Sequence, residues 1–352
     1  MPALCVIEGD GIGHEVVPEA VRVLQAALPR LEIVPAEAGW DCFVQRGVSV
    51  PDETLAAIRR CGAALFGAVS SPARKVAGYR SAIISMRQAL DLYANLRPVQ
   101  SLPGISPRQD VDLLLVRENT EGLYAGRERL DGDTAIAERV ITRAASYRIG
   151  WRALALAASR AASAPARGVS RLTIVHKANI LPVTDGLFRD TVRVAAQDFA
   201  RPGAAGAGVN IQVEELLVDV AAFKLVAEQQ SFDVIVTTNL FGDILSDEAA
   251  YWCGGMGLAP SLNWGQEVAL AEPVHGSAPD IAGKGIANPI ATILSAALLA
   301  RYAWRLPDVA CRIEDAVKTA LAQDIPLEKG QVVRSTPTAA ITQAVLNRMK
   351  TC

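Results

Sequence analysis

The sequence predicts an α/β protein with a largely parallel sheet, and three observations carry this prediction. Apolar runs of strand length alternate with amphipathic stretches of helical period, a pattern typical of parallel strands joined by helices. The chain has 352 residues, which is too long for one small core and suits two domains or one large unit. Its composition, 51% hydrophobic and 20% charged residues, is that of an ordinary globular protein.

Strands are expected where short apolar runs are bounded by turn residues. In chain order these runs are "ALCVIEG", "LEIVPAEAG", "AALFGAV", "VDLLLV", "RLTIVH", "IQVEELLV" and "FDVIVT". The stretch "RSAIISMRQALDLYANLRP" predicts a helix and then a strand, with Arg87 and Arg97 on either side of the turn between them. Two fixed cations this close indicate a ligand with more than one negative charge.

Helices are expected between and after these strands. The helical patterns run from Glu15 to Leu28, up to about Cys61, and over Asn288–Ala303, Pro307–Gln323 and Ala339–Met349. Two stretches of small residues, "AASRAASAPARG" and "RPGAAGAG", predict surface connections. The segment "YAGRERLDGDTAIAERVITR" predicts a hairpin that extends from the body and would suit a dimer contact.

Charge and cysteine usage exclude several classes of protein. The formal net charge is −2, so neither nucleic acid nor an acidic membrane surface is an expected partner. The six cysteines are scattered without a C-x-x-C pair, which argues against a disulfide framework or a zinc site and favours a reducing compartment. The start "MPALCVIEGD" lacks the basic region of a signal peptide, and "GIANPIATILSAALLA" is too short and polar to span a bilayer. We therefore expect a soluble cytoplasmic protein, or a mitochondrial matrix protein if the source is eukaryotic.

The glycine-rich stretch "GDGIG" lies between a predicted strand and helix. A dinucleotide loop of the G-x-G-x-x-G type would need glycine where His14 stands, and no acidic residue ends a following strand at the expected distance. The sequence therefore argues against a standard Rossmann site. Tight-turn glycines close to a ligand remain compatible with it.

The stretch "NLFGDILSDEAA" follows the strand "FDVIVTT" directly. Asp243 and Asp247 are four residues apart, so one helix face carries both carboxylates at the end of a strand where α/β proteins bind ligands. Oxygen ligands of this kind favour Mg²⁺ or Mn²⁺ over zinc. The structural alternative is a solvated helix start at which acidic residues are favoured by the helix dipole.

Two further stretches offer polar groups next to strands. "EPVHGSAPDIAGKGIANP" has little helical or strand period and is either a plain surface connection or a binding loop leading to a helix near Asn288. "VRENTEGLY" offers Arg117 and Tyr124, and "VHKANI" places Lys177 just past a strand. A tyrosine and a lysine near one site can exchange protons if burial lowers their pKa values. Taken singly, each is equally compatible with surface or packing roles.

Taken together and in this order, these stretches resemble the β-decarboxylating dehydrogenases, which include isocitrate, 3-isopropylmalate, homoisocitrate and tartrate dehydrogenases. The resemblance runs from "GDGIG" to "GIANP", and "NLFGDILSD" with "EPVHGSAPDIAGKGIANP" carries its most specific part. It implies an isopropylmalate dehydrogenase-like two-domain fold with a largely parallel central sheet, which is not a Rossmann fold. The implied large domain, on the cofactor side, comprises residues 1–98 and 246–352. The small domain, residues 99–245, holds the dimer contacts and the acid/base residues, and substrate, metal and cofactor meet in the cleft.

The resemblance also assigns roles to individual residues. The acid/base pair is Tyr124 and Lys177, and the metal ligands are Asp219, Asp243 and Asp247. The substrate-binding residues are Ser71, Ile84, Arg87, Arg97 and Arg117. The cofactor-binding residues are Asn179, Glu272, His275, Gly276, Ser277, Ala278, Asp280 and Asn288. Lys177 and Asp219 would serve the neighbouring subunit's site, so the resemblance implies a homodimer with shared active sites, or a tetramer built from such dimers.

The implied reaction is an oxidative decarboxylation of a small tricarboxylate-type 2-hydroxy acid. A divalent metal lowers the pKa of the C2 hydroxyl, Lys177 accepts its proton, and Tyr124 protonates the carbon after CO₂ has left. Asp280 stands where the family contacts the adenosine ribose. A carboxylate there accepts hydrogen bonds from ribose hydroxyls and repels a 2′-phosphate, so NAD is favoured over NADP.

The segment "SSPARKVAGY" followed by "DLYANLRP" looks most like homoisocitrate dehydrogenases of the α-aminoadipate lysine pathway. Ser71, with Arg74 or Tyr79, would bind the distal carboxylate of homoisocitrate, while Ile84 would contact its methylenes. The alternatives are 3-isopropylmalate dehydrogenase of leucine biosynthesis, then isocitrate or tartrate dehydrogenase. A non-catalytic regulatory subunit is the alternative from another class, but no ligand or acid/base residue is lost. The chain departs from the family pattern at Val220 and in "IPLEKGQVV", a loop that lies near the adenine in relatives.

Overall fold

The computed structural model of the chain describes residues 2–72, 74, 76–163 and 170–350. It divides the chain into two compact units. Unit 1 comprises Met1–Leu92, Ser101–Gln109 and Ala250–Cys352, and unit 2 comprises Tyr93–Gln100 and Asp110–Ala249. The functional roles expected for the large and small domains stay predictions.

Unit 1 contains five strands in the order β2-β1-β3-β12-β11. They pair in parallel except for the β11–β12 hairpin, which is antiparallel. Their bounds are Ala3–Gly9 (β1), Glu32–Pro35 (β2), Ala63–Ala68 (β3), Pro260–Trp264 (β11) and Ala269–Pro273 (β12). All six residues of β3 are buried, which explains why its sequence is a continuous apolar run rather than an alternating one.

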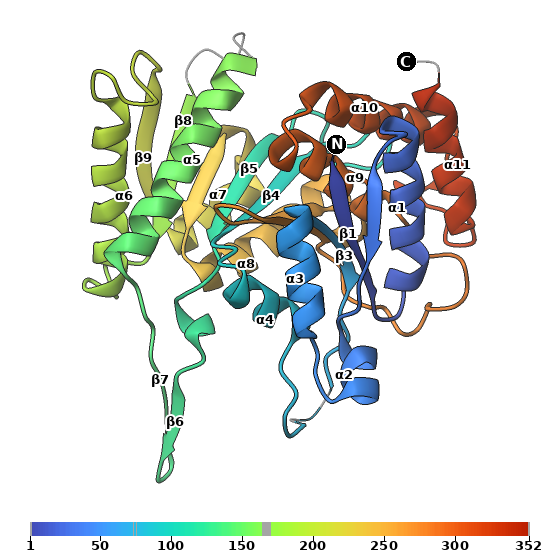
Figure 1. Ribbon diagram of the computed structural model, residues 1–352. Coiled ribbons are helices and arrows are strands. Elements are labelled where there is room, and N and C mark those ends of the chain that lie inside the picture. The colour runs from blue at the N-terminus through green and yellow to red at the C-terminus, as the bar shows by residue number, and fades with distance from the viewer. Residues whose placement is uncertain (1, 73, 75, 164–169, 351–352) are drawn as a thin grey trace. The chain divides into compact units, whose positions relative to one another are not determined.

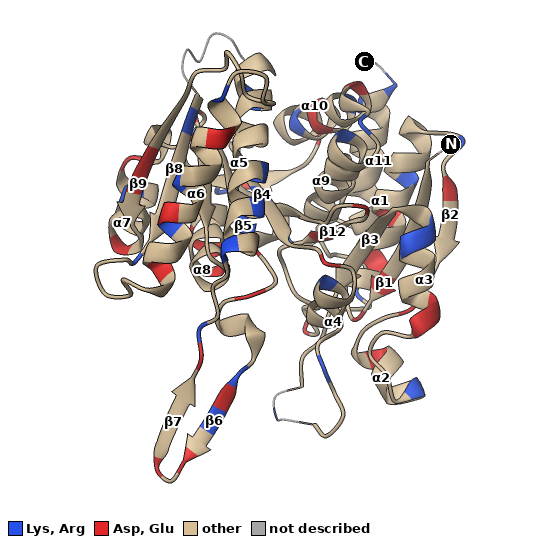
Figure 2. Cartoon of the chain, turned by 60° about the vertical axis from the view of Figure 1, so that its left-hand side comes forward, with Lys and Arg blue, Asp and Glu red and all other residues tan. Residues whose placement is uncertain are grey.

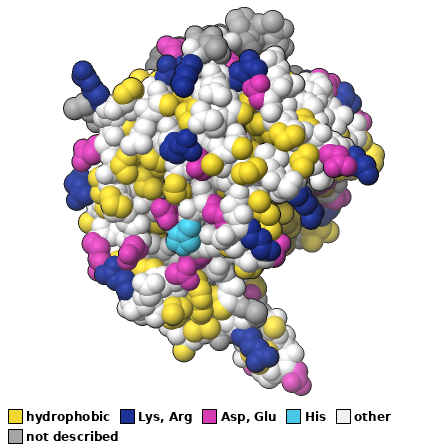
Figure 3. All heavy atoms as spheres, turned by 90° about the vertical axis from the view of Figure 1, so that its right-hand side faces the viewer, with side chains coloured by type: hydrophobic (Ala, Val, Ile, Leu, Met, Phe, Trp, Pro, Cys, Tyr) yellow, Lys and Arg dark blue, Asp and Glu magenta, His cyan; other side chains and the backbone are white. Residues whose placement is uncertain are grey.

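The helices of unit 1 begin and end close to the predicted positions, except that the helical pattern predicted up to about Cys61 is two helices, α2 and α3. They are Gly13–Ala27 (α1), Trp40–Arg46 (α2), Asp52–Cys61 (α3), Ala82–Ala89 (α4), Ile290–Leu298 (α9), Pro307–Gln323 (α10) and Thr338–Met349 (α11). Short 3₁₀ turns cover Ala250–Cys253 and Met256–Leu258, a π-helical turn extends α9 over Leu299–Ala303, and a small hairpin pairs Leu327–Glu328 (β13) with Gln331–Val332 (β14). On the face that carries α1 and α11, acidic and basic side chains of the described residues are interspersed rather than separated by sign (Figure 3).

Unit 2 contains the strands β4-β5-β10-β8-β9 in that order. β4 and β5 are antiparallel, and the remaining pairs are parallel. Their bounds are Ala94–Gln100 (β4), Asp112–Glu118 (β5), Ser170–His176 (β8), Ile211–Leu217 (β9) and Val234–Thr237 (β10). The helices are Arg143–Ser163 (α5), Thr184–Ala200 (α6), Val218–Ala227 (α7) and Asn239–Ala249 (α8), with 3₁₀ turns at Leu123–Ala125 and Gln229–Ser231.

The predicted hairpin is confirmed. Glu128–Asp131 (β6) pairs antiparallel with Thr134–Ala137 (β7), and the pair extends away from the other strands of unit 2 (Figure 1). Charged residues of both signs lie along it (Figure 2), and the Leu130 side chain on it is 75% exposed. The dimer contact expected of this hairpin stays a prediction.

The predicted α/β class with a largely parallel sheet is confirmed, and two local predictions are wrong. The stretch "AASRAASAPARG" was expected to be a connection, but its first seven residues continue α5 to Ser163; residues 164–168 lie outside the described part of the chain. Alanine and arginine are good helix formers, so small side chains alone did not signal a loop. The β11–β12 pair was not predicted, because "PSLNW" and "ALAEP" are short runs without clear alternation. Among the described residues, no helix has both the length and the apolar character needed to cross a membrane.

Candidate active site

The two predicted metal ligands on α8 are ion-paired with two predicted substrate arginines within unit 2. Asp247 accepts a hydrogen bond of 2.8 Å from Nη1 of Arg97, and Asp243 pairs with Nη1 of Arg117. The Asp243 side chain is 33% exposed and that of Asp247 is 50% exposed, whereas Arg97 and Arg117 are buried on β4 and β5. The carboxylates thus face an accessible side while the arginines anchor them from within.

Arg97 is held by polar side chains on both sides. Its Nε donates to Oδ1 of Asn95 at 2.9 Å, and its Nη1 donates to Oγ of Ser246 at 2.8 Å. Its Nη2 lies 3.6 Å from Oδ1 of Asp243. The guanidinium therefore spans the face of α8 between Asp243 and Asp247.

Arg117 is fixed even more tightly. Nε and Nη2 both donate to Oδ1 of Asn239, at 3.0 and 2.7 Å, and the Asn239 amide in turn donates to the Glu121 carbonyl at 3.1 Å. The side chain of Arg117 crosses α8 at Gly242, where an added Cβ would lie 2.6 Å from Cγ of Arg117. A glycine inside this helix is therefore required by the passage of the arginine.

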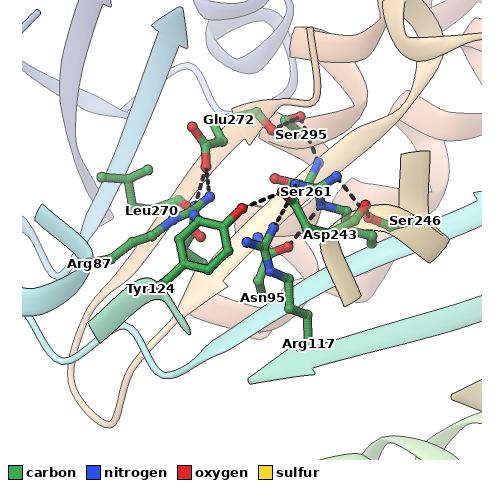
Figure 4. A network of polar contacts seen from close by, with 12 residues as sticks. Arg87, Asn95, Arg117, Tyr124, Asp243, Ser246, Ser261, Leu270, Glu272 and Ser295 are labelled. Carbon is green, nitrogen blue, oxygen red and sulfur yellow. Dashed lines mark hydrogen bonds and ion pairs between the residues drawn. The ribbon is translucent and has the colours of Figure 1, made fainter. Parts of the chain in front are cut away.

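Tyr124 points at the same carboxylate (Figure 4). Its phenol donates a hydrogen bond of 2.5 Å to Oδ2 of Asp243, and its ring lies 5.1 Å from Cζ of Arg117. Burial, followed by the hydrogen bond to Asp243, raises the pKa of Tyr124 above its usual value. The condition expected from the sequence, that burial lowers this pKa, is not met, because burial penalises the charged phenolate. Tyr124 therefore keeps its proton at neutral pH.

Lys177 and Asp219 form a separate pair in unit 2. Nζ of Lys177 is ion-paired with Oδ1 of Asp219, and the hydrogen bond from the lysine lowers the pKa of the Asp219 carboxyl. Lys177 directly follows β8, and Asp219 lies in the first turn of α7, which directly follows β9. The neighbouring strands β8 and β9 thus bring together two residues that are 42 positions apart.

The carboxylates fit a divalent metal only in part within one chain. Across the described residues, no group of three or more His, Cys, Asp or Glu side chains is arranged to hold a metal ion. Asp243 and Asp247 offer accessible oxygen ligands on one helix face, while Asp219 is paired with Lys177. Such a donor set suits Mg²⁺ or Mn²⁺ once a third carboxylate joins it.

In unit 1, the predicted substrate residue Arg87 contacts the predicted cofactor residue Glu272. Nη2 of Arg87 donates to Oε1 of Glu272 at 2.8 Å, and the same oxygen accepts from the Asn263 amide at 2.8 Å (Figure 4). Arg87 lies on α4 and is 8% exposed, while Glu272 lies on β12. The pair fixes the direction of the arginine.

Ile84 lies on α4, three residues before Arg87 and on the same face. It is half-buried, whereas its neighbour Ile83 packs against an apolar cluster of unit 1. Ser71 and Arg74 are exposed, and Ala73 and Lys75 of the same segment lie outside the described residues. The hydroxyl of Tyr79 donates to the Ser70 carbonyl at 2.9 Å, so its proton is already used within the segment.

The "GDGIG" loop is organised by Asp10, whose role the sequence did not indicate. This carboxylate is 1% exposed and accepts hydrogen bonds from three backbone N–H groups: Trp40 at 2.9 Å, Asp41 at 3.0 Å and Ser70 at 2.7 Å. It therefore ties the loop after β1 to the start of α2 and to the segment after β3.

The predicted cofactor loop packs against the same place. The backbone N–H of Ile12 donates to the Ser277 carbonyl at 2.9 Å, and Oγ of Ser70 donates to Oγ of Ser277 at 2.8 Å. An added Cβ at Gly11 would lie 2.2 Å from that carbonyl oxygen, which explains the glycine. The loops after β1, β3 and β12 therefore meet at one end of the unit 1 sheet, where α/β proteins bind ligands.

Individual residues of this loop fit a dinucleotide. Nδ1 of His275 lies 3.0 Å from the Gly276 carbonyl and so carries the proton, while Nε2 is buried and makes no hydrogen bond to any described residue. Burial lowers the pKa of His275, which leaves Nε2 as a neutral acceptor. Ala278 has a positive φ of 39°, a strained conformation common at functional sites. Asp280 is exposed.

Two other predicted cofactor-binding residues are Asn288 and Asn179. Asn288 has a structural role, because its Oδ1 accepts from the backbone N–H of Ile290 at 3.0 Å at the start of α9. Asn179 lies in an exposed turn two residues after Lys177, in unit 2. Their contacts with a cofactor stay predictions.

Comparison with known proteins finds relatives over nearly the whole chain. Residues 3–345 match the isocitrate/isopropylmalate dehydrogenase family. The chain is 51% identical to a Thermus thermophilus isocitrate/homoisocitrate dehydrogenase, over 99% of this chain and 98% of the relative. It is 46% identical to a 3-isopropylmalate/3-methylmalate dehydrogenase of Methanocaldococcus jannaschii, over 92% of each chain. It is also similar to the crystal structure of isocitrate dehydrogenase from Methylococcus capsulatus, with a TM-score of 0.88 and 39% identity over 99% of this chain and 100% of that one.

Proposed function

Since the chain belongs to the isocitrate/isopropylmalate dehydrogenase family and is a decarboxylating dehydrogenase, we propose that its substrate is homoisocitrate, which it converts to 2-oxoadipate and CO₂ with NAD and Mg²⁺ or Mn²⁺. Family members generally use NAD(P) and a divalent metal. The single observation behind the choice of acid is Ile84, a half-buried apolar side chain on the same face of α4 as Arg87.

An apolar side chain at this position disfavours a short acidic arm and favours a longer one. Isocitrate would place its third carboxylate close to Ile84, where a cation would be the better neighbour. In homoisocitrate one more methylene lies against Ile84 and carries the carboxylate on to Ser71 and Arg74, both exposed. Burial of a methylene contributes about 0.8 kcal/mol. Tyr79, whose hydroxyl proton is donated to Ser70, is left out of this set.

The second candidate is 3-isopropylmalate, and the same observation favours it in part. Ile84 would contact its branched apolar arm, but Ser71 and Arg74 would then have no carboxylate to bind. The names of the relatives support both candidates, since one is an isocitrate/homoisocitrate dehydrogenase and another a 3-isopropylmalate/3-methylmalate dehydrogenase.

The test is kcat/KM for homoisocitrate, isocitrate and 3-isopropylmalate in wild type, Ile84→Arg and Ala89→Arg. Homoisocitrate should be preferred by roughly 10- to 200-fold in the wild type, the range that one methylene of a pocket provides. Ile84→Arg should shift the preference toward isocitrate. Ala89→Arg adds the same charge at an exposed position on another face of α4 and should leave the preference unchanged. A wild-type preference for 3-isopropylmalate contradicts the proposal.

The acid/base roles follow from the environments of two side chains. When bound, the metal supplies a Lewis acid that lowers the pKa of the C2 hydroxyl, and NAD supplies the hydride acceptor. Lys177 accepts the hydroxyl proton at Nζ. Tyr124 holds its proton at Oη, as its raised pKa favours, and donates it to the carbon that has lost CO₂. Arg97 and Arg117 orient the substrate carboxylates through donors held by Asn95 and Asn239.

We further propose a homodimer with shared sites, as family members are typically homodimers. Lys177 and Asp219 pair with each other, and the exposed apolar side chains Ile180, Val183, Val220 and Phe223 flank them at 67%, 81%, 38% and 67% exposure. An apolar surface around a catalytic pair suits a second copy of the chain, which would bury that surface. The five cysteines of the described residues are free, which fits the cytoplasm as the compartment.

The choice of NAD rests on Asp280, whose exposed carboxylate follows the loop that packs on Gly11. Wild type should show a higher kcat/KM with NAD than with NADP, by about 10-fold or more, because a 2′-phosphate would be repelled. Asp280→Ala should lower the ratio of kcat/KM with NAD to kcat/KM with NADP, mainly by raising the KM for NAD. Equal values for the two cofactors in the wild type contradict this part of the proposal.

A further inference from the structure

A buried ion pair connects the base of the hairpin with the segment that carries Lys177. Arg139 lies two residues after β7, and its Nη2 lies 2.6 Å from Oδ1 of Asp185 on α6. The Asp185 side chain is completely buried and that of Arg139 is 12% exposed. The second carboxylate oxygen, Oδ2, accepts a hydrogen bond of 2.6 Å from the backbone N–H of Lys177. The lysine backbone is therefore fixed by a carboxylate whose charge Arg139 balances.

The same guanidinium also reaches the start of α8. Nη2 of Arg139 donates to Oγ1 of Thr238 at 2.9 Å, and Cζ lies 4.6 Å from the ring centroid of Phe241. Thr238 directly precedes Asn239, which holds Arg117, and Phe241 is two residues before Asp243. Arg139 thus contacts the carboxylate that holds the Lys177 backbone, and it also contacts the start of α8, the helix that carries the proposed metal ligands.

Stability does not account for this ion pair. Burial lowers the pKa of Arg139 and raises that of Asp185, and the attraction between them only partly offsets both shifts. Among the described residues, Nε of Arg139 has no hydrogen-bond partner, and Oδ1 of Asp185 is held only by its ion pair with Arg139. A buried ion pair left incompletely hydrogen-bonded is often no more stabilising than apolar side chains of similar volume. The pair is better explained by what it holds in place.

We propose that Arg139 and Asp185 are positioning residues of the reaction, which together fix the backbone of Lys177 and the start of α8. This inference rests on the proposed function, in which Lys177 accepts the substrate proton. Neither residue is assigned a contact with substrate or cofactor. Because a displacement of about 1 Å at a reacting group can cost roughly 100-fold in rate, loss of this anchor should be visible in kcat.

The test is the double variant Arg139→Met/Asp185→Asn, which removes both charges and so leaves no uncompensated charge in the interior. Its kcat, measured with homoisocitrate, NAD and Mg²⁺, should fall by about 10- to 100-fold while the KM for the acid changes by less than about threefold. The solvent deuterium isotope effect on kcat should rise, because proton transfer to Lys177 becomes slower. Arg139→Lys keeps the charge but loses the planar fork, so its kcat should lie between those of the wild type and the double variant.

A matched control is available in the same unit. Arg160 and Asp233 form another buried pair, with Nε and Oδ1 2.7 Å apart and both side chains 17% exposed. Arg160→Met/Asp233→Asn should lower the melting temperature but change neither kcat beyond about twofold nor the isotope effect. An equal loss of kcat in this control overturns the proposal.

Two further outcomes separate the positioning role from the proposed function. A folded Arg139→Met/Asp185→Asn variant with wild-type kcat, or with a lowered kcat and an unchanged isotope effect, overturns the positioning role when Lys177→Met is inactive. Full activity of Lys177→Met overturns the role of the lysine itself, and the positioning role falls with it.

Discussion

The two ends of the parallel strands in unit 2 use the same pair of residue types in different ways. At the amino ends, Arg160 contacts both Asp112, the first residue of β5, and Asp233, which precedes β10. At the carboxyl ends, Arg139 pairs with one carboxylate, Asp185, beside Lys177. Both sets are largely buried, and both join a helix or loop to the sheet.

The difference lies in how fully the polar atoms are satisfied. Burial alone would lower the pKa of Arg160, but Asp112 and Asp233 together raise it above its usual value. Asp233 also accepts from Oγ of Ser170 at 2.8 Å. Burial prevails at Arg139, whose pKa is lowered. The charged groups at the amino ends thus stabilise the fold. Those at the carboxyl ends are less completely hydrogen-bonded, an arrangement that stability alone would not retain.

The largest expected effect on activity comes from replacing one carboxylate at the carboxyl ends of the strands, and the matched replacement at the amino ends is its control. Asp243→Asn should lower activity by more than about 100-fold, since even partners of metal ligands typically contribute 10- to 100-fold. Asp233→Asn should leave kcat nearly unchanged and lower the melting temperature. Activity with added Mg²⁺ and with excess chelator is measured for wild type and both variants. Full wild-type activity in chelator rejects the metal role of Asp243.

A second test asks whether the residues at the carboxyl ends of the strands in one chain contribute to two active sites of a dimer. Tyr124→Phe and Lys177→Met subunits, each inactive alone, are mixed in equal amounts. Random pairing gives hybrids in which one of two sites escapes both changes, so about a quarter of wild-type activity should return. Proven hybrids without any activity would mean that each subunit works alone.

The hybrid dimer also tests the proposed positioning role of Asp185. Its working site uses Lys177 of the Tyr124→Phe subunit, so Asp185→Asn should lower the recovered activity when placed in that subunit. The same change in the Lys177→Met subunit, where the lysine is already lost, should have a much smaller effect. Equal effects in both placements would point to a general loss of folding instead.

The smallest effect concerns stability at alkaline pH. The pKa of Tyr124 is raised on folding, so its stabilising contribution is complete below the unfolded value of about 10 and is lost as the pH rises through the folded value. Tyr124→Phe should remove this part of the alkaline decline, at most about 1.4 kcal/mol per pH unit for one group. Urea unfolding of both proteins between pH 8 and pH 11 measures it, and parallel curves would contradict the assigned shift.

Motifs carried by neighbouring residues were predictable from the sequence, and contacts between distant residues were not. The alternation of strands and helices gave the fold class, and the spacing of Asp243 and Asp247 gave their common helix face. Asn239 and Gly242 stand in the same quoted motif, yet only the path of Arg117 across α8 shows why they are needed. A glycine within a helical pattern was the one available signal.

Other contributions had no local signal at all. Arg139 and Asp185 lie 46 positions apart, and neither belongs to a pattern that favours pairing. Asp10 was part of a motif tested only for its glycines, although its carboxylate orders three backbone N–H groups. Such roles depend on which loops meet in space, and periodicity along the chain does not contain that information.

The anchoring of the segment after β3 has a consequence for how new specificity can arise. Asp10 accepts a hydrogen bond from the backbone N–H of Ser70, and the Tyr79 hydroxyl donates to the Ser70 carbonyl, so Ser70 and Tyr79 are tied to each other and to the loop after β1. We therefore expect that exchanging the whole segment between relatives with different acids, with the ties at Ser70 and Tyr79 kept, changes substrate preference.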